Sequence, residues 1–209
     1  MSDSWTERQE QYMEVAHNVC NVNRLSTKDG RFWRVVGWSL QVASFGRFTR
    51  QRFLEEFAST LGPIQAYPRD WREIPFELIV HEARHTQQFL LAGWFIPILG
   101  WCGRGCRVWA GLLPMALVYG LFPLPIFFAW GRFQLELDAD CYAWRLALEQ
   151  GWMSATEVRN RAKHRGAIVA SWAYLKAWPK RWSVETYKKR AEQLIGAYEK
   201  VNVEARLSQ

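Results

Sequence analysis

The sequence is poor in histidine and cysteine, and it lacks several patterns that would place it in a class. Its four Cys, at positions 20, 102, 106 and 141, have neither the spacing of a disulfide framework nor that of a zinc knuckle, so we expect free thiols. The polar first residues contain no apolar core of a signal peptide, and we expect none. Lys and Arg form no long block, so nucleic-acid binding is unlikely despite a net charge of +7.

Tryptophan and long apolar stretches are present instead. The 13 Trp are typical of interfaces and membrane boundaries, where one end of the ring is buried and the other is wet. Residues 86–103 and 108–131 contain no charged side chain, and the second stretch is long enough to span a membrane. We expect residues 86–131 to form an apolar helical hairpin or re-entrant loop in a membrane. A buried apolar subdomain, or a cap over a substrate groove, is the alternative.

The rest of the chain predicts a mainly α (α+β) fold. Capping boxes, turn signals and helix breakers predict helices over residues 4–20, 49–61, 75–91, 133–150, 154–177 and 183–206. We place Ser4, Ser154 and Ser183 as N-caps and Pro75 in the first turn of its helix. Residues 31–45, rich in Val, Phe and Trp, favour one or two strands, with a helix as the alternative, and residues 64–67 favour a short strand.

One short motif carries chemistry: His81-Glu82-Ala83-Arg84-His85. On a helix the two imidazoles lie on one face, about 6 Å apart along the axis. Two nitrogens at that separation can share one Zn²⁺, and Glu82 can then reach a water molecule on the metal. A catalytic zinc site needs a third protein ligand and a fourth position for water.

A second motif, Glu136-Leu137-Asp138-Ala139-Asp140, supplies candidates for the missing groups. Glu136 and Asp140 are four residues apart and share a helical face. We expect Glu136 to be the third zinc ligand. We expect Asp140 to accept a hydrogen bond from the outward nitrogen of a ligand histidine, as metal-bound imidazoles require.

The two motifs together resemble those of the gluzincin metallopeptidases, His-Glu-x-x-His followed by Glu-x-x-Ala-Asp. The layout, with apolar segments between the motifs, is most similar to the membrane-embedded HtpX-like and CAAX prenyl protease type. His-Glu-x-x-His-x-x-Gln, with Gln88 here, also resembles smaller zincin-like domains of toxin and phage proteins. The resemblance implies one zincin-like domain over residues 1–209. It would hold an active-site helix, a small N-terminal sheet and the apolar hairpin between the metal-binding helices.

The expected function is zinc-dependent hydrolysis of peptide bonds in a peptide or protein substrate. Glu82 would act as general base toward a water activated by Zn²⁺. His164 would stabilise the oxyanion, with Tyr142, Tyr174 and Arg165 as other candidates.

A second hypothesis is a structural or membrane-penetrating assembly component, for example of a phage particle, which keeps the zinc site without turnover. Residues 86–131 would in either case contact a membrane or an apolar partner, with the catalytic part in the cytoplasm.

Overall fold

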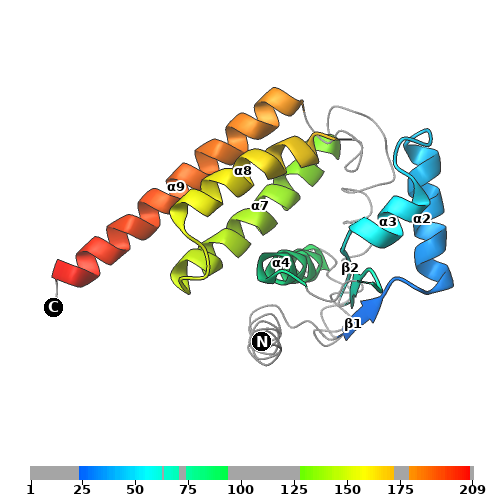
Figure 1. Cartoon of the computed structure of the whole chain (residues 1–209), viewed down its shortest axis with the longest axis horizontal. Helices are drawn as coiled ribbons and strands as arrows, with labels where there is room; N and C mark the ends of the chain where they lie inside the picture. The colour runs from blue at the N-terminus through cyan, green and yellow to red at the C-terminus, as the bar shows by residue number, and fades with distance from the viewer. Residues whose placement is uncertain (1–23, 63, 71–73, 94–127, 172–178, 208–209) are drawn as a thin grey trace. The chain divides into compact units, whose positions relative to one another are not determined.

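The computed structural model describes residues 24–62, 64–70, 74–93, 128–171 and 179–207, in which helices predominate over a small sheet (Figure 1). The expected mainly helical fold is therefore confirmed. The chain divides into two compact units, residues 1–123 and 124–209. The single zincin-like domain stays a prediction. The helix predicted over residues 4–20 lies outside the described residues.

The first unit contains a three-stranded sheet of β1 (Arg24–Thr27), β2 (Ser59–Leu61) and β3 (Ile64–Tyr67). β3 is the central strand, parallel to β1 and antiparallel to β2. Gly62, between β2 and β3, has φ of 57°, a left-handed conformation that glycine adopts without steric cost. The strand predicted over residues 64–67 is confirmed.

Two helices, α2 (Arg31–Ala43) and α3 (Arg50–Glu56), precede β2. The strands favoured over residues 31–45 are wrong, because burial follows helical spacing: Trp33 and Gly37 are the buried residues of α2. Trp33 packs near Phe53 of α3, with ring centroids 6.4 Å apart. A Cβ at Gly37 would lie 2.9 Å from Cγ of Arg50, so glycine lets the two helices approach closely.

The helix predicted over residues 49–61 begins as expected and ends early. The Thr49 hydroxyl accepts a hydrogen bond from the Arg52 N–H and caps α3. The helix stops at Glu56 because residues 59–61 pair with β3 as strand β2. Pairing with a distant strand therefore overrides the local helical pattern.

Helix α4 (Phe76–Gly93) carries the first motif and contacts β2 and β3. Its predicted start is confirmed within one residue, since the Pro75 carbonyl accepts from the N–H groups of Leu78 and Ile79. Ile79, Val80 and Ala83 are buried. Residues 94–127, most of the predicted hairpin, lie outside the described part. Within the described part, no helix has the length and apolarity that crossing a membrane requires.

The second unit consists of α7 (Phe128–Glu149), α8 (Ala155–Val169) and α9 (Lys180–Leu207), which pack side by side (Figure 1). Ser154 and Glu157 form the predicted capping box at the start of α8. The helix predicted to reach residue 177 ends at Val169. Ser183 is not an N-cap: α9 begins earlier, and the Pro179 carbonyl accepts from the Ser183 N–H.

We predict that Gly166→Ala destabilises the second unit. A Cβ at Gly166 would lie 2.8 Å from Cα of Val184 and 3.1 Å from the Ser183 carbonyl oxygen, so α8 and α9 would have to separate. Overpacking of this kind costs about 1 to 3 kcal/mol. Urea unfolding followed by circular dichroism measures the loss.

The matched control is Gly196→Ala in α9, where a Cβ meets nothing within 4 Å. Alanine there should be neutral or stabilising by up to about 1 kcal/mol, because it favours the helix. Equal effects of the two substitutions would show that the close approach at Gly166 is not a constraint.

Candidate metal centre

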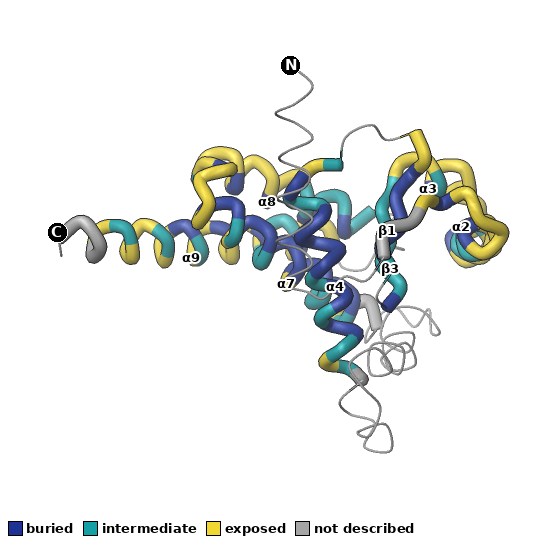
Figure 2. Tube along the Cα trace, turned by 90° about the horizontal axis from the view of Figure 1, so that it is seen from below, coloured by how far each residue is buried: buried dark blue, intermediate teal, exposed yellow. Residues whose placement is uncertain are grey.

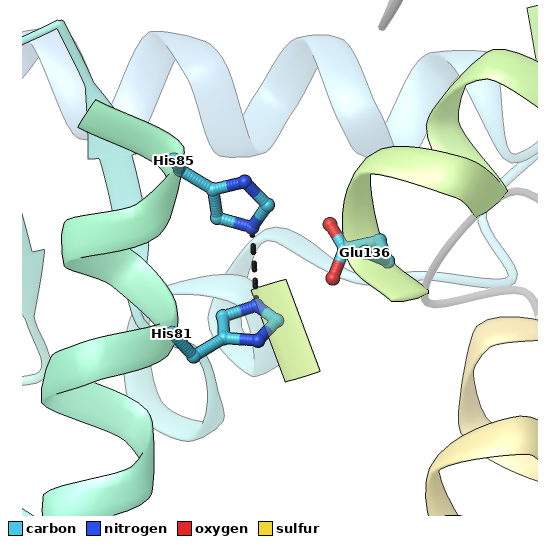
Figure 3. A group of neighbouring side chains, drawn as sticks. All are labelled: His81, His85 and Glu136. Carbon is cyan, nitrogen blue, oxygen red and sulfur yellow. Dashed lines mark hydrogen bonds between the residues drawn. The ribbon is translucent and has the colours of Figure 1, made fainter. Parts of the chain in front are cut away.

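Helix α4 presents two imidazoles to one another. His81 and His85, both buried, have their Nε2 atoms 3.0 Å apart and their rings nearly perpendicular, at 88° (Figure 3). The Nδ1 of His85 lies 2.8 Å from Oε1 of Gln88, an oxygen that only accepts. The proton of a neutral His85 ring therefore sits on Nδ1, which leaves the Nε2 lone pair directed toward His81.

Glu82 follows His81 in the sequence and is also buried. A residue of the sheet holds its carboxylate. The hydroxyl of Thr60, on β2, lies 2.6 Å from its carboxylate Oε2 and 3.0 Å from its main-chain oxygen. The shorter contact is that of a hydroxyl donating to a carboxylate. Sequence reasoning missed Thr60, because no local pattern links a strand residue to a helix residue 22 positions away.

A buried lysine shares the surroundings of Glu82. Lys28 is 3% exposed, and its Nζ donates to Ser59 Oγ at 2.7 Å and to the Phe53 carbonyl at 3.2 Å. It also lies 3.7 Å from the centroid of the Phe53 ring. Burial lowers the pKa of Lys28 to about 7, against the opposing effect of the Glu82 charge. Burial, and then the same carboxylate, raises the pKa of the Tyr67 phenol.

The second unit buries the two carboxylates of the second motif. Glu136 and Asp140 lie four residues apart on α7. Arg165 of α8 donates from Nε to both oxygens of Asp140, at 2.9 and 3.1 Å, and its Nη2 lies 3.3 Å from Oε2 of Glu136. The Tyr187 hydroxyl of α9 donates to Asp140 at 2.8 Å. Burial and the Asp140 charge raise the pKa of Tyr187 well above its usual value.

This network gives Asp140 contacts that the sequence did not suggest. Arg165 and Tyr187 are its hydrogen-bond partners within the second unit. Its expected bond to a ligand histidine stays a prediction. Tyr187 was missed because it lies 47 positions from Asp140, on another helix.

The other predicted residues are placed less distinctively. His164 is exposed on α8, and its role as oxyanion donor stays a prediction. Tyr174 lies outside the described residues. Cys141 is a free thiol, as expected, and burial raises the pKa of this thiol to about 12.

His81, His85 and Glu136 form a group of potential metal ligands in the described part of the chain. Each of the three offers one ligand atom, an imidazole nitrogen or a carboxylate oxygen, and all three residues are buried (Figure 3). Two imidazole nitrogens and a carboxylate oxygen are a donor set that Zn²⁺ takes in catalytic sites. The residues present therefore fit the metal that the two motifs imply.

Comparisons of the chain with protein-family models, with curated proteins and with solved structures find no match. The resemblance to gluzincins rests on the two motifs.

We predict that the stability of the protein relative to Lys28→Met rises with pH above about 7. The native state of the wild type releases the Lys28 proton near pH 7, while the unfolded state keeps it up to about 10.5. The unfolded state then binds more protons, so the wild type gains at most about 1.4 kcal/mol per pH unit. Urea unfolding at pH 6, 7.5 and 9 measures the difference.

Lys180→Met, at an exposed lysine of α9, is the control and should show no such trend. A constant difference between the wild type and Lys28→Met over this range would mean that Lys28 stays charged in the folded protein.

Proposed function

We propose that this protein is a zinc-dependent metallopeptidase with His81, His85 and Glu136 as metal ligands. The observation that carries the proposal is the pair of buried imidazoles whose Nε2 atoms face each other at 3.0 Å. Two lone pairs pointed at one another repel unless a proton or a metal ion lies between them. Glu136, the buried carboxylate of the second motif, is the proposed third ligand.

Three protein ligands leave one position for water in a four-coordinate site, which is the arrangement of catalytic rather than structural zinc. Bound there, Zn²⁺ would lower the pKa of a water molecule toward 7 and polarise a substrate carbonyl. Glu136 would be held by Arg165, whose guanidinium contacts both Glu136 and Asp140. Asp140 in turn is fixed by Tyr187. These contacts orient the carboxylate of Glu136 before any metal binds.

Glu82 is the proposed general base. Its carboxylate would accept a proton from the attacking water, and the acid that forms would return that proton to the leaving amine. The Thr60 hydroxyl restricts the Glu82 side chain through Oε2 and leaves the carboxylate in one orientation. Thr60 is therefore a positioning residue for the proposed base.

The expected membrane contact of residues 86–131 stays part of this proposal, as does a peptide or protein substrate. The structural or membrane-penetrating alternative shares the metal site and differs only in turnover, so zinc binding and hydrolysis are tested separately.

We predict one tightly bound zinc per chain in the purified wild type and a large loss in Glu136→Ala. Removing groups that orient a metal ligand costs about 10- to 100-fold in affinity, and removing the ligand itself costs at least as much. Competition with a chelator, read by metal analysis after dialysis, measures the affinity.

Glu149→Ala, at a carboxylate of the same helix α7 with a part-exposed side chain, is the control and should keep the zinc. Equal zinc in wild type and Glu136→Ala would remove Glu136 from the ligand set.

We predict that Glu82→Gln abolishes hydrolysis while keeping zinc, because the amide cannot accept the proton. Thr60→Val should lower kcat about tenfold at unchanged KM and zinc content, as expected for one hydrogen bond to a charged group. Thr60→Ser, which keeps the hydroxyl, should restore kcat. The assay uses labelled casein and a mixture of fluorogenic peptides.

Retained turnover in Glu82→Gln would exclude Glu82 as the base. A Thr60→Val enzyme with the kcat of the wild type would exclude the positioning role of Thr60 and leave the other proposed roles unaffected. Zinc-loaded wild type that cleaves no probe would favour the structural alternative.

A further inference from the structure

Helix α2 turns an apolar face outward. Trp33 and Gly37 are buried against α3, whereas many other residues of α2 are exposed, as the yellow along the tube shows (Figure 2). Large apolar side chains recur among the exposed residues every three or four positions: Phe32, Val35, Trp38 and Val42 on α2, and Phe45 just past its end. All five are more than half exposed. A helix that is apolar on both sides is ordinarily buried or in contact with lipid. We call these five residues the α2 face.

Phe45, just past the end of α2, is the most exposed member of the face. Its side chain is 88% exposed, and its φ is 54°. This left-handed conformation belongs to the helix ending, because the Phe45 N–H donates to the Val42 carbonyl and the Gly46 N–H to the Gln41 carbonyl. The exposure of the ring, and not its backbone, bears on a contact outside the fold.

The segment that carries the α2 face has charged residues of one sign. No acidic residue occurs between Asp29 and Glu55. The same segment holds five exposed arginines: Arg31, Arg34, Arg47, Arg50 and Arg52. Of these, Arg52 is paired with Glu56. Two of the five, Arg31 and Arg34, lie on α2 itself, so the helix that carries the apolar face is positively charged and complements an anionic surface.

We infer that the α2 face binds a lipid surface rich in anionic headgroups. The aromatic and aliphatic side chains would enter the boundary between headgroups and acyl chains, and the arginines would contact lipid phosphates. A nucleic acid would use the arginines but not exposed Val35 and Val42. A second copy of the same face would bring arginines against arginines. This contact is independent of the proposed zinc site and of residues 86–131.

The test is sedimentation of the full-length protein with vesicles of phosphatidylcholine, either alone or with about a quarter phosphatidylglycerol. We expect binding to the anionic vesicles that weakens as salt is raised, since exposed charges are screened. The variant Trp38→Ser/Phe45→Asn should bind at least tenfold more weakly. Its fold should be unchanged by circular dichroism, because both side chains are exposed.

Trp182→Ser, at an exposed tryptophan of α9, is the matched control and should bind as the wild type does. Wild-type binding by the double variant would overturn the inference, because any membrane contact would then lie elsewhere. Two other outcomes would also overturn it: short duplex DNA that binds through the α2 face while vesicles do not, or a dimer that the double variant abolishes. Loss of zinc or of peptidase activity in any of these proteins has no bearing on the vesicle result.

Discussion

The mutual approach of two imidazoles on α4 is the constraint on which the candidate site depends. Burying His81 and His85 with their Nε2 atoms 3.0 Å apart removes both imidazoles from water and makes the two nitrogens face each other. The arrangement is stable when a shared proton or cation lies between the nitrogens. The Gln88 Oε1 accepts a hydrogen bond from His85 Nδ1–H, which in a neutral ring leaves Nε2 without a proton. A single helical turn therefore sets the spacing of the pair, and Gln88 sets the tautomer of His85.

The carboxylates of the two motifs are held by different means, each within its own unit. Glu82 accepts a hydrogen bond from a hydroxyl of β2, which is a neutral donor. Glu136 and Asp140 share Arg165, whose fixed positive charge offsets part of the cost of burying two acids four residues apart. These different environments suit the two proposed roles. A general base, proposed for Glu82, has to change its protonation, whereas a metal ligand, proposed for Glu136, has to stay ionised.

Local sequence patterns correctly predicted the features that depend on local interactions. The capping box at Ser154 and the helix that carries His81 were correct because hydrogen bonds within four residues determine them. The strands favoured over residues 31–45 failed because β-propensity is weak against the burial of Trp33 and Gly37 on α3.

The sequence patterns did not predict contacts between residues that are far apart in the chain. Thr60 with Glu82, and Tyr187 with Asp140, join separate elements, and any hydroxyl along the chain was an equal candidate. Lys28 was not predicted for a related reason. A lysine that follows a strand is ordinarily exposed, and only the fold shows that this one is buried against Phe53 and Ser59.

The two proposals rest on opposite departures from the usual distribution of side chains. Polar groups are buried on α4 and α7, while aromatic groups are exposed on α2. Each departure costs stability that the fold alone does not recover, which is the physical reason to look for a metal at the first and a lipid surface at the second.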